Sequence, residues 1–271
     1  MSMTDGEIRE LCNRFFDAYQ DRRVDELADI YSSDCVVWHN VFGGREMSGK
    51  DNLAALPASY EGQRRRTYDD RIINTFEGGF VIQYTLHGVQ HSGHKGALWM
   101  DLHRRAVQQR QDHPHRRIHG FRQISGVARC QARSQGECIV RQDWNLLALC
   151  DRFFDAIEQK DFATLEQCYA PEAMVWHSHD CLYQPRDANL ATLRDGMTRL
   201  KKMRFKNRRV HTFEGGFVQQ HTLFVTHPND FVGQMDVCFV AFVRDGMISR
   251  AYEYFDTGQM DRFLGPRAGA A

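Results

Sequence analysis

Apolar residues recur at helical spacing near the start of the chain and again beyond its middle. Both stripes follow the steps i, i+3, i+4, i+7, i+8 and i+11, which place their side chains on one face of a helix. The stripes consist of Ile8, Leu11, Cys12, Phe15, Phe16 and Tyr19, and of Leu146, Leu149, Cys150, Phe153, Phe154 and Ile157. We therefore predict two amphipathic helices, and we interpret Cys12 and Cys150 as small core residues rather than reactive thiols.

Each of these helices opens a stretch of sequence that the chain contains twice. LCNRFFDAYQ at residues 11–20 returns as LCDRFFDAIEQ at 149–159, and VVWHN at 36–40 returns as MVWHS at 174–178. TFEGGF occurs in both stretches without change. The offset of 137 to 138 positions is far longer than the ~20–50 residues of a solenoid repeat, so it predicts a duplicated domain.

Within each copy the pattern moves from helices to strands. A shorter helix follows the first one, and next come a strand through Trp38 or Trp176, a third helix and hairpins turned on Gly-Gly pairs. In the second copy, strands at 231–243 and 248–255 are joined by an Asp-Gly turn. Helices first and antiparallel strands afterwards predict an α+β fold, in which a curved sheet folds over a long helix.

That order, the VWHN strand, the hairpins and GMISRAYEYFD at residues 246–256 together resemble the nuclear-transport-factor-2-like superfamily. The nearest resemblance is to its SnoaL-like branch, kin to ketosteroid isomerases, polyketide cyclases and limonene epoxide hydrolases. It covers about residues 5–102 and 143–264. The resemblance implies two cone-shaped domains, each with helices packed on a curved antiparallel sheet and an open end that holds a small apolar ligand.

Residues 103–133 match nothing in the other copy, and they hold eight Arg, four His and a single acid. Such a stretch invites an RNA-binding or a metal-site interpretation, but Cys and carboxylate partners at zinc spacing are missing from it. Read one base later with suitable synonymous codons, residues 108–130 encode NNGKITRIDEYMDSGKYQALLG. This peptide aligns without a gap with RDGMISRAYEYFDTGQMDRFLG at 244–265. We therefore hypothesise that a frameshift near residues 103–107, restored before about Trp144, replaced the last strand of the first copy.

These observations divide the chain into four parts. They are a truncated first SnoaL-like copy, an aberrant Arg/His-rich segment, a complete second copy and a tail, at residues 1–102, 103–137, 138–265 and 266–271. A cone without its closing strand exposes a sheet edge, so we expect the first copy to be damaged and any surviving site to belong to the second. We also expect residues 103–137 to be poorly ordered or oddly packed.

Charge and cysteine content indicate which partners and which cellular compartment to expect for the protein. The 35 Lys and Arg residues balance the 35 Asp and Glu residues, which argues against nucleic-acid and anionic-membrane partners. An acidic N-terminal stretch, and eight cysteines without a Cys-x-x-Cys pair, predict a cytoplasmic protein with reduced thiols. An intrachain pseudo-dimer of the two copies and a homo-oligomer both stay open.

The first candidate catalytic acid lies on the strand before the Asp-Gly turn of the second copy. Alternation places Asp236 on one strand face with the apolar residues Cys238, Val240 and Phe242, where burial among them would favour its protonated form. Ketosteroid isomerases keep a carboxyl group protonated in this way to donate a hydrogen bond. Asp236 lies close to the position of that acid but not in register with it. Asp101 repeats the pattern in the first copy.

The second candidate acid, Glu253, lies on the final strand within AYEYFD. This run resembles the RDYFD of limonene epoxide hydrolases, in which the first acid is catalytic. Those hydrolases use an Asp–Arg–Asp arrangement, and here Gln234 stands where the arginine would be, which argues against simple epoxide hydrolysis. An ion pair of Glu253 with Arg208, Arg209 or Arg250 is the structural alternative.

The VWHS strand supplies further candidates, because in the family it lines the cone. Pleating sends Trp176 and His177 to opposite faces, so at most one of them points inward. The epoxide-hydrolase resemblance favours Trp176 with Ser178 as ligand-binding residues, whereas the need for a group that titrates near neutrality favours His177. A purely structural histidine is equally open. We expect His221, on a neighbouring strand, to face the same interior. The counterparts in the first copy are Trp38 and His39.

Two functions remain after these exclusions. The first is cofactor-independent acid–base chemistry on a small hydrophobic molecule, in which Asp236 and Glu253 move protons and His177 or His221 orients the substrate. This would be an isomerase, dehydratase, cyclase or hydrolase step. The second is a non-catalytic ligand-binding or dimerisation module of the same fold. We expect neither a cofactor nor a metal, and we interpret the basic runs at 64–66 and 201–209 as solvated faces.

Overall fold

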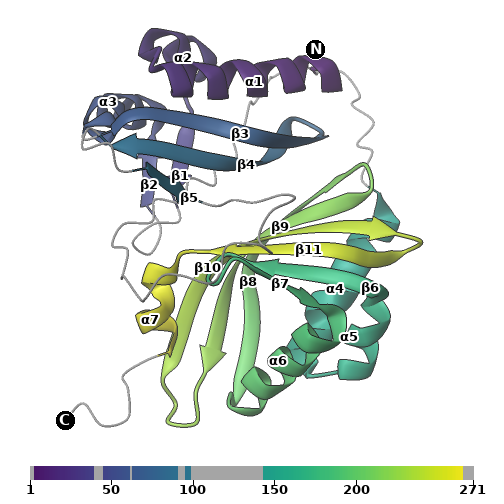
Figure 1. Cartoon of the computed structure of the whole chain (residues 1–271). Helices are drawn as coiled ribbons and strands as arrows, with labels where there is room; N and C mark the ends of the chain where they lie inside the picture. Colours follow the sequence, from purple (N-terminus) through teal and green to yellow (C-terminus); the bar gives the residue numbers. More distant parts are fainter. Residues whose placement is uncertain (1–2, 40–44, 62, 91–94, 99–142, 265–271) are drawn as a thin grey trace, which may run out of the picture. The chain divides into compact units, whose positions relative to one another are not determined.

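The computed structural model describes the chain in five stretches, which are residues 3–39, 45–61, 63–90, 95–98 and 143–264 (Figure 1). The described chain divides into two compact units, one built mainly before residue 99 and one mainly after residue 142. The segment at 103–137 and the candidate Asp101 lie outside the described residues, so their predictions stay predictions.

The described part of the N-terminal unit contains three α-helices, α1 (Asp5–Asp21), α2 (Val24–Ile30) and α3 (Gly49–Tyr60). Helix α1 begins at a capping box. The Glu7 amide donates to the Thr4 hydroxyl at 3.3 Å, and the Thr4 amide donates to the Glu7 carboxylate at 2.6 Å. The predicted apolar stripe is confirmed, since Cys12 and Phe16 are buried in the core of this unit.

The described strands of the N-terminal unit form two sheets. One pairs β1 (Val36–His39) with β2 (Arg45–Ser48), and the other has the order β3 (Gln63–Phe76), β4 (Gly79–Gln90), β5 (Lys95–Leu98). The predicted Gly-Gly hairpin joins β3 to β4. Gly78 has a φ of 72° at this turn, a conformation that glycine adopts without a steric penalty.

The C-terminal unit repeats the two-helix start with α4 (Trp144–Gln159) and α5 (Phe162–Cys168), followed later by α6 (Arg186–Thr198) and the short α7 (Met260–Leu264). Asp143 caps α4, because its carboxylate accepts hydrogen bonds from the amides of Asn145 and Leu146 at 2.9 and 3.2 Å. The second predicted stripe is also confirmed. All six of its residues are buried.

Six strands of the C-terminal unit form one sheet in the order β7-β6-β11-β10-β9-β8. Their bounds are β6 (Tyr169–His177), β7 (Leu182–Pro185), β8 (Lys202–Phe213), β9 (Gly216–Thr226), β10 (Val232–Arg244) and β11 (Met247–Phe255). The two strands predicted at 231–243 and 248–255 are therefore confirmed within one residue at each end. The sequence predicted an antiparallel sheet, but β11 runs parallel to β6. The hairpin of β11 with β10 sets the direction of β11, and β11 pairs with β6 in that direction.

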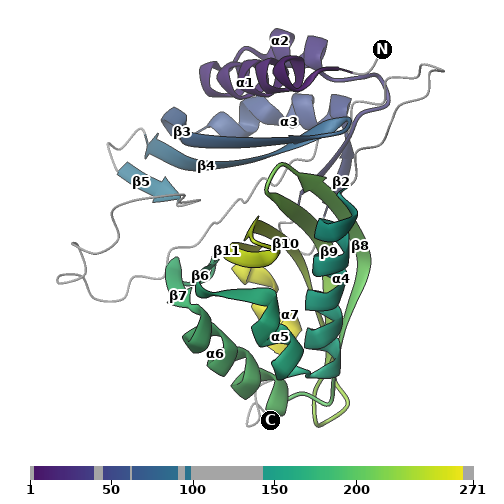
Figure 2. The same ribbon diagram turned by 90° about the vertical axis from the view of Figure 1, so that its right-hand side faces the viewer.

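Helices α4, α5 and α6 lie on one side of this curved sheet (Figure 2), which we call the helix-facing side. The core of the unit lies between them. Phe153 of α4 stacks on Phe239 of β10 with ring centroids 5.3 Å apart, and Val175 and Ala251 are buried in the same cluster. Burial of each such aromatic side chain contributes about 2–3 kcal/mol. Their positions identify which strand residues point towards the helices.

Candidate functional site

Glu253 and His177 point to the helix-facing side of the sheet. Side chains alternate along a strand, and the core residues Ala251 and Val175 lie two positions before Glu253 and His177. Glu253 is also the register partner of His177 in the parallel pairing of β11 with β6. The structure thus decides the question that the sequence left open at the VWHS strand, because His177 faces the helices and Trp176 does not.

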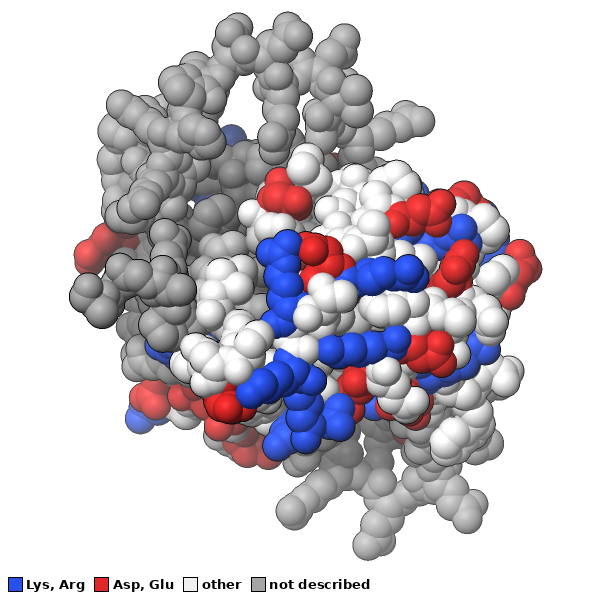
Figure 3. Space-filling model, turned by 90° about the horizontal axis from the view of Figure 1, so that it is seen from below, with Lys and Arg blue, Asp and Glu red and all other residues white. Residues whose placement is uncertain are grey.

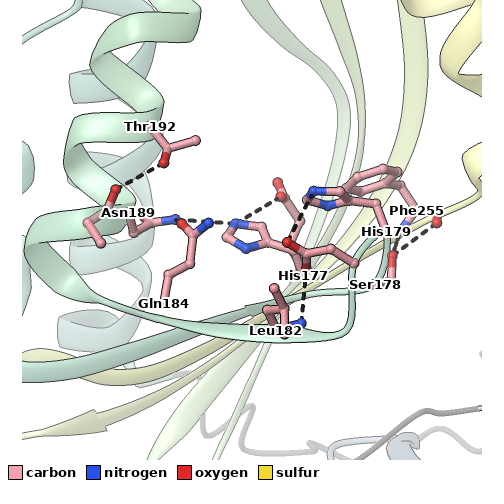
Figure 4. Close-up of polar contacts among 11 residues, drawn as sticks. His177, Ser178, His179, Leu182, Gln184, Asn189, Thr192 and Phe255 are labelled. Atoms are coloured by element: carbon pink, nitrogen blue, oxygen red, sulfur yellow. Dashed lines mark hydrogen bonds and ion pairs between the residues drawn. The ribbon is translucent and has the colours of Figure 1, made fainter. Parts of the chain in front are cut away.

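His177 lies beside Asn189 of helix α6 and Gln184 (Figure 4), and it also comes close to Glu253. His177 Nε2 lies 3.7 Å from Glu253 Oε2 and 3.2 Å from Asn189 Nδ2. The same Asn189 amide nitrogen lies 3.5 Å from Gln184 Oε1. An amide nitrogen can only donate, so Nε2 of His177 accepts, and the imidazole proton is on Nδ1. We call Glu253 and His177 the acid–base pair.

Burial shapes the protonation of both members of the pair. It raises the pKa of Glu253 to about 7, against a smaller opposing effect of the nearby His179. Burial lowers the pKa of His177, and Asp180 opposes this effect. Near neutrality the pair is therefore an uncharged imidazole beside a carboxyl group that is half protonated. The Glu253 side chain is still 31% exposed, whereas that of His177 is 12% exposed.

This arrangement can move a proton in either direction. A carboxyl group with a pKa near the working pH combines a useful fraction of each protonation state with a low cost of transfer. Because His177 is neutral, it adds no charge that would lower the pKa of Glu253, and the effect of His179 is smaller than that of burial. The structural alternative, an ion pair of Glu253 with an arginine, does not occur among the described residues.

Asp236 lies on the other side of the sheet. Its neighbours Met235 and Val237 belong to the core under α4, so Asp236 points away from the helices. Its carboxylate accepts a hydrogen bond of 2.8 Å from the Thr222 hydroxyl, and its amide donates to Gln259 at 3.0 Å. Three further candidates share this side of β10, namely Cys238, Val240 and Phe242. The structure does not bring this group together with the acid–base pair.

Trp176 and Ser178 have packing partners of their own. Trp176 is 1% exposed and packs on the rings of Tyr252 and Tyr254, with centroids 6.3 and 5.2 Å away. These tyrosines lie on the side of β11 opposite Glu253. The Ser178 hydroxyl donates to the Phe255 carbonyl oxygen and accepts from the Phe255 amide, both at 3.0 Å. Ser178 therefore ties the end of β6 to β11.

His221 lies on the helix-facing side, as expected, two strands away from Glu253. It is 5% exposed and lies edge-to-face with Phe154 and Phe205. Its Nδ1 lies 3.1 Å from Gln219 Nε2. Burial, with a smaller effect of the Arg208 charge, lowers the pKa of His221 to about 3. His221 is therefore an uncharged histidine at physiological pH.

The N-terminal unit reproduces this site only in part. Trp38 and His39 end β1, at the positions of Trp176 and His177. Tyr84, which is 2% exposed, replaces His221. Asn52 occupies the position of Asn189 on α3 and donates to the Tyr31 hydroxyl at 3.1 Å. No described residue of this unit corresponds to Glu253.

Two contributors to the site, Asn189 and Gln219, were not among the sequence candidates. Asn189 is 2% exposed and Gln219 is 0% exposed. A signal for Asn189 was present, since the NLA tripeptide occurs in the third helix of both copies. A polar residue kept at a helix position that faces the core needs a hydrogen-bond partner there. Gln219 had no such signal, because Ile82 replaces it in the first copy.

Lys201 and Arg204 of the basic run at 201–209 lie beside acidic side chains, as the interpretation of a solvated face requires, whereas Arg208 points towards α4 and Gln219. Figure 3 shows Lys and Arg interleaved with Asp and Glu on one face of the molecule. Lys201 pairs with Asp230 at 2.6 Å, and Arg204 pairs with Glu158 at 3.3 Å. The described residues contain no cluster of His, Cys, Asp or Glu suited to a metal ion. None of their helices is long and apolar enough to cross a membrane.

Comparison with known families supports the resemblance seen in the sequence. The family model described as the SnoaL-like domain matches residues 150–251. Residues 150–251 of the C-terminal unit are thus similar to the SnoaL-like domain. The matched residues all lie in this unit. Comparison with curated proteins gave no match.

Solved structures similar to the chain include three from bacteria. An NTF2-like protein from Burkholderia pseudomallei is 20% identical and has a TM-score of 0.40, over 45% of this chain and 98% of its own. An LEH-like epoxide hydrolase from M. tuberculosis is 18% identical and has a TM-score of 0.39, over 44% and 90%. A protein from Shewanella putrefaciens, assigned as a SnoaL-like polyketide cyclase, is 10% identical and has a TM-score of 0.41, over 45% and 98%.

Proposed function

We propose that the SnoaL-like domain catalyses a proton transfer on a small hydrophobic molecule without a cofactor, and that Glu253 is the group that carries the proton. The observation behind this proposal is the acid–base pair. Glu253 has a pKa near 7, is partly exposed and faces the helices 3.7 Å from a neutral His177. An isomerisation, dehydration, cyclisation or hydrolysis each needs such a group.

His177 acts in this proposal as a positioning residue that can donate a hydrogen bond to the substrate. Asn189 holds Nε2, so the Nδ1–H is the donor, and it is buried without a partner among the described residues. A substrate oxygen or nitrogen that accepts this hydrogen bond would be held beside Glu253.

The experiment compares Glu253→Gln with Glu172→Gln, an exposed carboxylate of the same sheet on β6. Both variants and the parent protein are assayed for turnover of a panel of steroid, terpenoid and polyketide-like compounds between pH 5 and 9. We expect Glu253→Gln to lose activity by about 10²–10⁴-fold and Glu172→Gln to keep it. The parent pH profile should have an inflection near pH 7. Full activity of Glu253→Gln, or a profile without this inflection, contradicts the proposal.

A non-catalytic binding or pairing module is the second candidate, and one observation favours it. The side of the sheet away from the helices has an aromatic cluster of Trp176, Tyr183, Tyr252 and Tyr254. Aromatic rings suit pairing of one sheet with another, and three of these four, Trp176, Tyr252 and Tyr254, are at most 3% exposed. In this case the panel would contain compounds that bind but none that turn over, and Glu253→Gln would bind them as tightly as the parent.

We further propose that the N-terminal unit is an incomplete copy of the SnoaL-like domain. In the C-terminal unit β11 pairs with both β6 and β10, and so joins them in a single sheet. In the described part of the N-terminal unit, β1-β2 and β3-β4-β5 are separate sheets. A counterpart of β11 is the strand that would join them, which agrees with the altered reading frame inferred from the sequence.

A further inference from the structure

A β-bulge in β8 lies directly opposite His221. Lys206 pairs with Thr222 and Arg209 pairs with Gln220, so Asn207 and Arg208 together oppose His221. Asn207 has a φ of 54°, in the left-handed region. A bulge of this kind re-aims a side chain, and here it directs Arg208 over the ring of Phe154 at 5.5 Å.

Arg208 determines how the neighbouring amide is oriented. Its Nη2 pairs with Asp151 Oδ1 of α4 at 2.6 Å, and its Nε donates to Gln219 Oε1 at 2.8 Å. The Cys150 thiol also donates to this oxygen at 3.3 Å. With two donors facing its oxygen, Gln219 presents its NH₂ group to His221 Nδ1 at 3.1 Å. Nδ1 is therefore an acceptor, and the proton of the neutral imidazole is on Nε2.

The resulting Nε2–H is a buried donor without a hydrogen-bond partner among the described residues. His221 is 5% exposed, and buried donors in native proteins are almost always paired. It points to the same side of the sheet as Glu253. On β10, which lies between β11 and β9, Phe239 is the register partner of Glu253 on one side and of Gln219 on the other. From the spacing of strands and residues, His221 and Glu253 are on the order of 12 Å apart between Cα atoms.

The N-terminal unit shows that this network is more than a support for the bulge. The same bulge occurs in β3, where the register shifts between Asp69 and Ile72. There Arg71 also pairs with an acid of the first helix, Asp17, at 2.7 Å. Ile82 and Tyr84 replace Gln219 and His221, however. The bulge and its arginine thus form without the Gln–His pair, which the C-terminal unit has in addition.

We propose that His221 Nε2–H is an oriented hydrogen-bond donor for a carbonyl oxygen of the ligand, held in this tautomer by Gln219 and Arg208. The ligand class is a small, mostly apolar ketone whose oxygen lies at the His221 end of the site. This inference rests on the proposed function, because it assumes that the ligand binds between the sheet and the helices. His221 thereby selects for the carbonyl group, while Glu253 acts elsewhere on the same molecule.

The first test measures the tautomer in the full chain without any ligand. Two-bond ¹H–¹⁵N spectra separate a protonated Nε2 from a protonated Nδ1, and His221→Phe identifies the signal of His221 among the 13 histidines. We expect Nε2–H in the parent. In Gln219→Glu the new carboxylate should accept from Nδ1 and move the proton there, while Gln220→Glu, on the opposite face of the strand, should leave the signal unchanged. A proton on Nδ1 in the parent, or a doubly protonated ring at pH 7, overturns the proposal.

The second test uses 2-acetylnaphthalene and 2-isopropenylnaphthalene, which have the same shape and differ in the carbonyl oxygen. Affinities are measured in a Glu253→Gln background, so no turnover is required. We expect the ketone to bind about tenfold more tightly and this preference to disappear in His221→Phe and Gln219→Glu. Equal affinities, or no binding of either compound, overturn the role of His221. The proposed function fails separately, through full activity of the Glu253→Gln variant.

Discussion

Glu253 and His177 are register partners on adjacent parallel strands, and their side chains meet 3.7 Å apart on the side of the sheet that packs against the helices. Burial acts on the two groups in opposite directions: it raises the pKa of the acid and lowers that of the base. Both changes favour the uncharged forms, so near neutrality a neutral imidazole lies beside a half-protonated carboxyl group, and the contact is not a salt bridge.

The raised pKa of Glu253 predicts how stability depends on pH. Between about pH 4.5 and 7 the folded protein keeps the Glu253 proton that the unfolded chain has released, so this group's contribution to stability is lost as the pH rises through 7. Glu253→Gln removes that loss. We expect the variant to be more stable than the parent at pH 8, by on the order of 1–2 kcal/mol, and the difference to vanish near pH 4.5.

Thermal unfolding of the two proteins across this pH range measures the difference directly. The comparison is made between variant and parent because His177 and His221, whose pKa values are lowered, destabilise the parent as the pH falls below about 6.5. Glu172→Gln is the control and should show no such pH dependence. A constant difference between Glu253→Gln and the parent would show that burial does not hold the Glu253 proton.

Asn189 is expected to act through His177. In Asn189→Asp the new carboxylate replaces the amide donor at 3.2 Å, which should raise the pKa of His177 and favour a cation beside Glu253. We expect kcat to fall about tenfold or more with a smaller change in KM, and the inflection of the pH profile to move below 7. Asn145→Asp, at the exposed start of α4, is the matched control. A purely structural role would lower stability without moving the inflection.

Asp236 is expected to matter less than its sequence context suggests. It faces away from the helices and accepts a hydrogen bond from Thr222, which an asparagine at this position can also accept. We therefore expect Asp236→Asn to keep at least half of the activity and to lose about 1 kcal/mol of stability or less. Parallel assays with Glu253→Gln measure the contrast. A loss of 100-fold or more in Asp236→Asn would return this residue to the catalytic group.

The frameshift hypothesis predicts that the N-terminal unit gains structure when the original reading frame is restored. Replacing residues 108–130 by NNGKITRIDEYMDSGKYQALLG should supply the strand that joins the two sheets of the N-terminal unit, because β11 does so in the C-terminal one. We expect slower amide hydrogen exchange in β1 and β5 and a higher Tm. A scrambled peptide of the same composition is the control. Codons that cannot encode this peptide one base later would end the frameshift hypothesis before any protein is made.

The local elements were predictable because local signals specify them. The stripes of α1 and α4 depend on residues three and four apart, and the Gly-Gly and Asp-Gly turns on neighbouring residues. The order of these elements was enough to recognise a SnoaL-like domain, and the family match confirms it for residues 150–251. The parallel pairing of β6 with β11 was missed, because these strands lie far apart in the sequence and no local pattern encodes their register.

The site depended on choices that local patterns leave open. The alternation of side chains along a strand places His177 and Trp176 on opposite faces and Asp236 on the same face as Cys238. It does not indicate which face meets the helices. Only the packing of α4 and α6 on the sheet decides this. The same packing brings Asn189 to His177, and a one-residue bulge turns Arg208 towards Gln219. The sequence by itself therefore determined the elements and the two candidate faces of each strand. The tertiary structure decided which side chains are buried together, because a side chain loses its water only when the helices pack on the sheet.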